Sequence, residues 1–250
     1  MASVGISSYN LNLASDIGID QLFISPENLK STDYLNKLSD WTEKNKMKLN
    51  EKKTAIMIFN PTKKYQFSTR LMLNNNLLNI PQKTKLLGLI ISSDLTWHKN
   101  TKMLVKKAYQ RTMLLKKLFE FSVPKSDLIT IYIQFVRSVL EQSCPVWHSS
   151  ITKEEETNLE RVQRVSLRII LKEKYEDYEN ALLQTDLQTL KERRETLCLE
   201  FATKCTKHET NYLMFPLNPA SHVMPKRNPE KYYVQHSNSN RLKKSAIPYL

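Results

Sequence analysis

The sequence predicts an α+β protein, in which a small N-terminal piece made of a helix and an antiparallel sheet is followed by an α-helical bundle and a flexible tail. Two observations predict this class. Compact strand-like runs separated by turn residues precede residue 97, and helical spacing of apolar residues dominates from 98 to about 207. We therefore divide the chain into four segments. Residues 1–24 are a poorly defined lead-in, and 25–97 are the piece made of a helix and a sheet. Residues 98–207 are the helical bundle, and 208–250 are a Pro- and Asn-rich tail that we expect to be flexible.

The N-terminal piece contains one expected helix and four expected strands. Ser25-Pro26-Glu27 is a favourable helix start, because Ser caps free amides and Pro is pre-set for the first helical position. Apolar residues at near-helical spacing through Trp41 carry this helix to about Lys46. The strands are expected at 54–59, 66–73, 77–80 and 85–92, with a turn at 74–76. Gly88 inside the last run indicates a bulge or a close backbone approach, or else plain weakening of the strand.

The helical part begins with a strongly basic segment. Seven basic residues and no acidic one lie between Lys99 and Lys117. At helical spacing an apolar side separates from a basic side, which carries Lys99, Lys102, Lys106 and Lys117. That basic side suits a phosphate backbone, and it equally suits a solvated helix face; both interpretations stay open.

Four further helical segments follow. The first starts at Pro124 and is apolar all round, so we expect it to be surrounded by other helices. Thr152 and Glu155 form a capping box that opens the second. A short segment near 178–183 and a longer one from about 187 to 207 complete the bundle. The second segment carries a stripe that either grips phosphates or pairs with neighbouring glutamates, namely Arg161, Arg164 and Arg168.

Composition narrows the classes of partner. Lys plus Arg number 38 against 25 acidic residues, a net charge of +13, which favours an acidic partner. Nucleic acid is the first candidate and an anionic membrane surface the second, while a basic surface without a partner is the third interpretation. With three glycines in 250 residues, the chain lacks the clustered glycines of a Walker loop or a dinucleotide fingerprint. We expect no small-molecule substrate and no cofactor bound by this chain.

The chain is expected to be intracellular, in the cytoplasm or the nucleus. Its three cysteines show no CxxC spacing, which is typical of reduced residues. Residues 1–11 lack the basic and apolar regions of a signal peptide. The longest strongly apolar run, 128–136, is well short of the ~20 residues that a membrane-spanning helix needs.

The sequence contains no convincing catalytic constellation. Two-metal catalysis uses converging carboxylates, often an adjacent pair, and the chain has no Asp-Asp; Asp16 and Asp20 fit capping or solvated roles better. The histidines are scattered, with no His-x-Asp and no zinc-type cluster. Cys144 and His148 are four apart, but Pro145 disrupts the turn between them, so we expect a buried structural cysteine beside a surface histidine.

Several segments resemble a known family in order and spacing. These are Trp41 with Leu49-Asn50-Glu51-Lys52-Lys53-Thr54, Lys85-Leu86-Leu87-Gly88 through Asp94-Leu95-Thr96-Trp97, Phe135-Val136-Arg137-Ser138-Val139-Leu140-Glu141, Val146-Trp147-His148-Ser149-Ser150, Leu159-Glu160-Arg161-Val162-Gln163 and Arg193-Arg194-Glu195. Together they resemble the region downstream of the catalytic aspartates in reverse transcriptases of non-LTR retrotransposons, the jockey-like elements in particular. The likeness covers nearly the whole chain.

The resemblance implies a fragment of an RNA-directed DNA polymerase from a mobile element. Residues 25–97 would be the end of a palm, and 98–207 a thumb and connection that holds an RNA/DNA template–primer. Lys53 would lie near the phosphates of the incoming nucleotide. A surface lysine at a strand entrance is the favoured interpretation, because the adjacent Lys52 fits the pattern almost as well. The resemblance also assigns structural positions to Trp41, Asn50, Gly88, Trp97 and Trp147.

The departure from the family pattern limits the expected activity. The metal-binding aspartates are absent from these 250 residues, so we expect the chain alone to be inactive, with Mg²⁺ needed only by an intact polymerase. Two alternatives stay open. One is a non-enzymatic nucleic-acid-binding protein or a relic of such an element. The other is a domain that is sometimes grouped by name with the N-terminal region of an AlkB homologue, although the residues support neither oxygenase nor methyltransferase chemistry.

Overall fold

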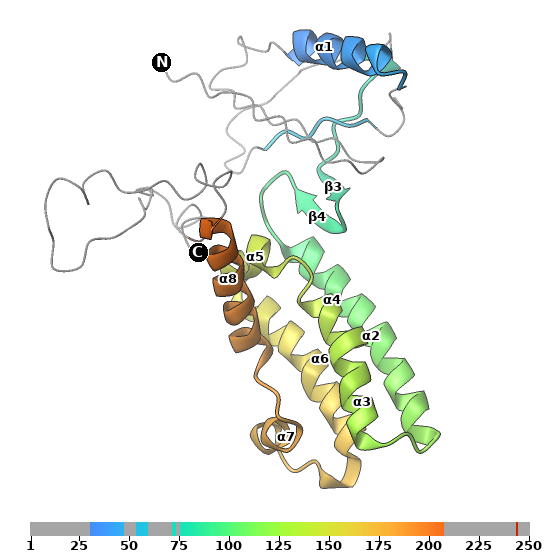
Figure 1. Cartoon of the computed structure of the whole chain (residues 1–250), viewed down its shortest axis with the longest axis vertical. Coiled ribbons are helices and arrows are strands. Elements are labelled where there is room, and N and C mark those ends of the chain that lie inside the picture. The colour runs from blue at the N-terminus through green and yellow to red at the C-terminus, as the bar shows by residue number, and fades with distance from the viewer. Residues whose placement is uncertain (1–30, 48–53, 60–71, 74–75, 208–243, 245–250) are drawn as a thin grey trace, which may run out of the picture. The chain divides into compact units, whose positions relative to one another are not determined.

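A computed structural model of the chain describes residues 31–47, 54–59, 72–73, 76–207 and 244 (Figure 1). The chain divides into two compact units, Met1–Thr96 and Trp97–Leu250, each of which is described separately below. In the described residues the first unit holds a helix and short antiparallel hairpins, and the second is helical. The fold is therefore of mixed α and β character, in keeping with the α+β class that the sequence predicts.

Helix α1 (Ser31–Lys44) is the helix expected at the start of the N-terminal piece. Its expected beginning at Ser25 lies outside the described residues. The chain leaves the helix at Lys46, where φ is 55°, and Met47 donates a hydrogen bond back to the carbonyl of Thr42 at 2.8 Å. Trp41 keeps 44% of its surface exposed, so its ring is only partly buried.

Two hairpins make up the strands of the first unit. Strand β1 (Met72–Leu73) pairs with β2 (Asn76–Leu77), and β3 (Lys83–Leu86) pairs with β4 (Leu89–Ser92), both antiparallel. The single strand predicted over 85–92 is therefore wrong. Leu87 and Gly88 both have positive φ, 47° and 89°, as in a two-residue turn of type I′. Gly88 is thus neither a bulge nor a weak point in a strand, because it supplies one of the left-handed residues that this turn requires.

The run 54–59 does not form the predicted strand. Among the described residues it makes one parallel bridge, between Ala55 and Asn79, and Ile56 donates to the carbonyl of Asn79 at 3.0 Å. A short apolar run predicts burial, but pairing along its length depends on a partner strand that periodicity does not identify.

The second unit is built around a pair of long helices, α2 (His98–Glu120) and α6 (Lys153–Leu171), which lie side by side (Figure 1). Leu104, Ala108 and Leu115 of α2 have no exposed surface, as their helical spacing predicts. Thr112 of α2 meets Ser166 of α6, with 3.3 Å between their hydroxyl oxygens. Burial of each such leucine contributes roughly 1.5–3 kcal/mol, so this seam anchors the unit.

The apolar segment after Pro124 is not one regular helix. It comprises α3 (Lys125–Ile131), the π-helical turn η2 (Tyr132–Arg137) and α4 (Ser138–Leu140). Its buried residues are Leu128, Tyr132, Val136, Val139 and Leu140. The expectation that the segment is surrounded is wrong, because Phe135 is 40% exposed and Gln134 and Thr130 face solvent. Helices α2 and α6 cover one side of it and leave the other side open.

The remaining elements close the bundle. They are α5 (Cys144–Trp147), the 3₁₀ turns η3 (His148–Ser150) and η4 (Lys172–Lys174), α7 (Tyr178–Thr185) and α8 (Leu190–Lys207). The predicted capping box at the start of α6 is present in both directions between Thr152 and Glu155. On α6, helical spacing of the apolar residues predicts an inward face of Leu159, Val162, Val165 and Ile169. Leu159 and Val162 are buried, whereas Val165 and Ile169 are only half-buried. The tail from 208 lies outside the described residues except for Lys244.

Candidate nucleic-acid interface

A stripe of lysines runs along the solvent side of α2. We call Lys99, Lys102, Lys106 and Lys117 the α2 basic stripe; all four are exposed. Gln110 and Met113, also exposed, complete the three- and four-residue spacing between Lys106 and Lys117. Helix α2 has a single acidic residue, Glu120, in its last turn. Among the described residues no acidic side chain forms an ion pair with a lysine of the stripe.

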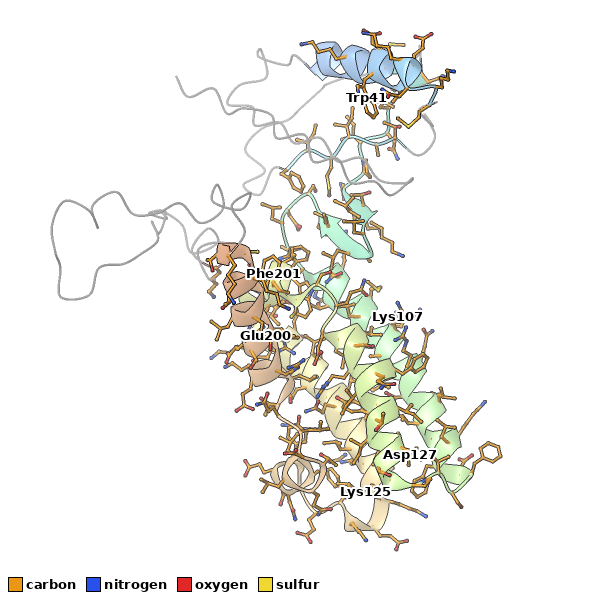
Figure 2. The ribbon with its side chains drawn as sticks, in the orientation of Figure 1. Trp41, Lys107, Lys125, Asp127, Glu200 and Phe201 are labelled. Carbon is orange, nitrogen blue, oxygen red and sulfur yellow. The ribbon has the colours of Figure 1, made fainter. Side chains whose placement is uncertain are left out.

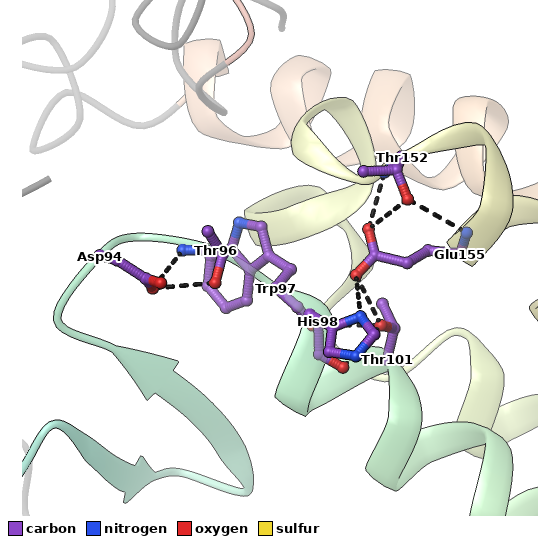
Figure 3. Close-up of polar contacts among 7 residues, drawn as sticks. All are labelled: Asp94, Thr96, Trp97, His98, Thr101, Thr152 and Glu155. Carbon is purple, nitrogen blue, oxygen red and sulfur yellow. Dashed lines mark hydrogen bonds and ion pairs between the residues drawn. The ribbon is translucent and has the colours of Figure 1, made fainter.

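The first turn of α2 is fixed to the start of α6 through Glu155. This glutamate is 6% exposed, and its Oε1 accepts a hydrogen bond from Thr101 at 3.1 Å (Figure 3). His98 Nδ1 lies 3.6 Å from the same oxygen. The other oxygen accepts from the backbone N–H of Thr152 at 2.7 Å, as part of the capping box. One carboxylate thus joins two helix N-termini and sets the direction in which the stripe begins.

The last turn of α2 is fixed by its own backbone. Val123 donates to the carbonyl of Leu118 at 3.3 Å, and Ser122 donates to that of Phe119 at 2.9 Å. These two hydrogen bonds, together with a φ of 58° at Ser122, define a Schellman motif. Ser122 occupies the left-handed position in which Gly is commonest. Both ends of the stripe are therefore held on rigid backbone, which reduces the entropy lost when a partner binds.

The arginines predicted on α6 form a second, different surface. Arg161, Arg164 and Arg168 are all exposed. The guanidinium carbon of Arg164 lies 4.7 Å from the ring centre of Tyr178, and that of Arg168 lies 5.1 Å from the ring centre of Tyr175. Within the described part of the chain none of the three forms an ion pair with a glutamate, and for Arg164 and Arg168 cation–π stacking replaces the ion pairs considered from the sequence.

The two basic surfaces do not merge. Thr112 and Ser166 mark the line along which α2 and α6 touch. At about 100° per residue, Arg164 and Arg168 lie roughly 160° from Ser166 around the α6 axis. The lysines of the stripe lie between about 80° and 140° from Thr112 around the α2 axis. The body of α6 therefore separates the arginines from α2.

A buried polar network holds α7 and the start of α8 against the bundle. Tyr132 donates to Gln163 Oε1 at 2.6 Å, and Gln163 Nε2 donates to Tyr178 Oη and to the carbonyl of Gln188, both at 2.9 Å. Tyr178 in turn donates to Glu160, which also accepts from the N–H of Leu190 at 3.1 Å. Burial raises the pKa of Tyr132 and Tyr178, the latter also through its bond to Glu160. These hydroxyls stay protonated and serve packing.

The cysteine and histidine considered as a nucleophile pair do not form one. Cys144 and Cys198 are both buried, and the interaction with the Cys198 thiol together with burial raises the pKa of Cys144. His148 is 8% exposed, so the expectation of a surface histidine is wrong. Its Nδ1 accepts a hydrogen bond from Arg194 Nε at 3.2 Å, an arrangement that sequence spacing does not reveal.

The residues that the resemblance singled out fall in different places. Lys53 and Asn50 lie outside the described residues. Trp97 is half-buried at the N-terminal end of α2, and Trp147 is fully buried. Asp94 accepts hydrogen bonds from the backbone N–H and the hydroxyl of Thr96, at 3.1 and 2.8 Å, which fixes a tight turn (Figure 3). Among the described residues no three His, Cys, Asp or Glu side chains gather as metal ligands.

Comparisons with known proteins assign no family. No family model, no curated protein and no solved structure matches this chain. Within the part that the structure describes, no helix has the length and apolar character to cross a membrane. The exposed basic surfaces are therefore the features of the described chain that point to a function.

Proposed function

We propose that the helical unit binds the phosphate backbone of a nucleic-acid duplex through the α2 basic stripe, without base preference. The observation that carries the proposal is the row of four exposed lysines on one rigid helix, none of them paired with an acidic residue of the described chain. At ~1.5 Å per residue the stripe spans about 27 Å, most of one duplex turn of roughly 34–36 Å. Lysines that neutralise phosphates release counterions, which drives binding regardless of sequence.

An RNA/DNA template–primer is the duplex that the resemblance favours. On this proposal the helical unit is the thumb and connection of an RNA-directed DNA polymerase from a non-LTR element, and the first unit is the end of its palm. Intracellular location, in the cytoplasm or nucleus, belongs to the same proposal. The lysine geometry serves a non-enzymatic binding protein equally well, so binding and catalysis need separate experiments.

An anionic membrane surface is the less favoured partner for the stripe. A helix that lies in a membrane interface inserts an apolar face below its basic residues. In α2 that face is buried in the bundle, where Leu104, Ala108 and Leu115 are fully covered. The stripe therefore offers charge without an apolar face of the kind that interfacial helices insert.

The test compares two charge-matched variants of the full chain in fluorescence anisotropy titrations of a labelled RNA/DNA hybrid. Lys102→Gln with Lys106→Gln removes two charges from the stripe, and Lys174→Gln with Lys204→Gln removes two exposed charges elsewhere. If all four lysines of the stripe contact phosphates, they contribute about −3.6 to the slope of log K against log salt, and the stripe variant reduces this by about 1.8. The control variant is expected to keep the wild-type slope.

Two results would contradict the proposal. One is equal loss of affinity in both variants, which would mean that net charge and not the stripe attracts the duplex. The other is undetectable or salt-insensitive binding by the wild-type chain at low ionic strength.

A further inference from the structure

The α2 basic stripe ends on an exposed aromatic side chain. Phe121 follows Lys117 by four residues, so it continues the stripe on the same side of the helix. It is 80% exposed, the highest value among the aromatic residues of the described chain. The line along α2 therefore carries four lysines over about five turns, with Gln110 and Met113 between Lys106 and Lys117, and ends on a phenyl ring.

The ring is presented on a fixed backbone. Phe121 is the C-terminal cap of α2, and its N–H donates to the carbonyl of Lys117 at 3.2 Å. The Schellman bonds of Ser122 and Val123 follow directly, and Pro124 limits the backbone where α3 begins. Because the chain already holds this turn, a partner that stacks on the ring gains contact at a small cost in entropy.

The ring of Phe121 suits a base, and the lysines in the neighbouring segments suit the phosphates of the same strand. Lys116, Lys117 and Lys125 are exposed in the segments that flank Phe121, and Figure 2 shows Lys125 at the beginning of α3. Glu120, the one acidic residue of α2, is adjacent to Phe121 in the chain and would repel a phosphate. A nucleobase is uncharged and has a flat face that stacks on an aromatic ring.

We infer that Phe121 is a stacking platform for an unpaired base, placed where a duplex held along the α2 basic stripe opens into a single strand. This inference rests on the proposed function, since the lysines must first hold the duplex. It adds a preference that phosphate contacts alone do not give: a hybrid with a single-stranded extension binds more tightly than the blunt hybrid. No base preference follows, because every base has a stacking face.

The experiment measures the affinity of the full chain for a blunt RNA/DNA hybrid and for the same hybrid with a short single-stranded extension. Wild type is expected to favour the extended hybrid. Phe121→Ala and Phe121→Leu are expected to lose that preference, with affinity for the extended hybrid falling about 5- to 150-fold. Phe121→Trp is expected to keep it and to show tryptophan quenching on binding, beyond any quenching seen with wild type.

Two controls separate stacking from misfolding and from general apolar exposure. Phe121→Ala removes an exposed side chain, so its melting temperature is expected to match wild type. Leu183→Ala removes an 83% exposed apolar residue on α7 and is expected to leave both affinities unchanged.

The outcomes for the two proposals are distinct. If Phe121→Ala keeps the preference for the extended hybrid while Lys102→Gln with Lys106→Gln weakens both hybrids, the stacking inference is overturned and the proposed function stands. If wild type binds neither hybrid, the proposed function fails and the stacking inference fails with it. Binding to vesicles that contain phosphatidylserine, with loss on Phe121→Ala and no binding to either hybrid, would assign the ring to a membrane and overturn both.

Discussion

Arg194 donates a hydrogen bond from its Nε to the Nδ1 of His148 over 3.2 Å, and both side chains are buried. A histidine nitrogen accepts such a bond only while it carries no proton. The guanidinium carbon of Arg194 also lies 5.9 Å from the ring centre of Trp147, so α8 is joined to the α5–η3 segment by one cation. The arrangement depends on a neutral imidazole.

This contact predicts acid sensitivity of the fold. Burial lowers the pKa of His148 to about 4, and the charges of Arg194 and Lys191 contribute to the lowering. The unfolded chain has a histidine pKa of about 6.5, so below that pH it binds a proton that the folded chain refuses. The contribution of His148 to the free energy of unfolding is therefore fully present above about pH 6.5. It is lost as the pH falls towards 4, by on the order of 2–3 kcal/mol.

Urea unfolding of wild type and His148→Gln at a series of pH values tests the prediction. The glutamine oxygen can accept from Arg194 but does not titrate in this range. Between pH 6.5 and 4 we expect wild type to lose more unfolding free energy than His148→Gln, because only wild type has the titrating imidazole. The carboxylates contribute equally to both proteins. Parallel curves for the two proteins across that range would show that His148 does not control the acid response.

Periodicity predicted the elements whose burial is decided locally. The buried face of α2, the capping box at Thr152 and the approximate extents of α7 and α8 all depend on residues within a few turns of one another. Prediction failed where distant partners decide the outcome. Strand formation by 54–59 depends on a partner strand, and the burial of the segment after Pro124 depends on how much of it α2 and α6 cover.

The candidate site was predictable in part for the same reason. The α2 basic stripe is a property of one helix, and its exposure follows from burial of the opposite side. The stacking of Arg164 and Arg168 on Tyr178 and Tyr175 depends on where the chain returns after α6, which helical spacing does not encode. Phe121 had a local signal, its place four residues after Lys117, but the exposure of its ring follows from the turn that ends α2.

The network around Gln163 predicts a large loss of stability on its removal. Gln163 is fully buried and bonds Tyr132, Tyr178 and the carbonyl of Gln188. Gln163→Leu leaves the Tyr132 hydroxyl and the Gln188 carbonyl without this partner, at ~1–3 kcal/mol each, so we expect a total loss of about 2–6 kcal/mol. Tyr132→Phe removes one hydroxyl and is expected to cost about 1–2 kcal/mol.

Urea unfolding of the two single variants and the double variant checks this network. The double variant is expected to lose less than the sum of the single losses, because the bond between Tyr132 and Gln163 can be removed only once. Strictly additive losses would mean that the two residues do not stabilise the fold through one shared bond.

The arginines of α6 are expected to matter less for nucleic-acid binding than the lysines of α2. Arg164 and Arg168 already stack on tyrosine rings, and the body of α6 separates them from α2. A duplex along the α2 basic stripe therefore leaves them outside its contact area. In salt titrations, Arg164→Gln with Arg168→Gln is expected to keep the wild-type slope within about 0.5, against a change of about 1.8 for Lys102→Gln with Lys106→Gln. A change in slope as large as that of the lysine variant would place both surfaces on the nucleic acid.

Binding and polymerisation are predicted to separate in this chain. Nucleotide transfer by two metal ions needs carboxylates that converge on Mg²⁺, and these 250 residues contain no adjacent aspartate pair. We therefore expect no primer extension when the purified chain is given a primed RNA template, deoxynucleotides and Mg²⁺, at protein concentrations where anisotropy shows the template–primer bound. Replacing Mg²⁺ with Mn²⁺ is expected to change nothing, because the missing element is the ligand set and not the choice of ion.

An active reverse transcriptase in the same reaction controls for the substrate, and incorporation that rises with the concentration of this chain would contradict the prediction. Without such incorporation, the chain's contribution to any polymerase would be the grip on the duplex, which the α2 basic stripe provides in the proposal above.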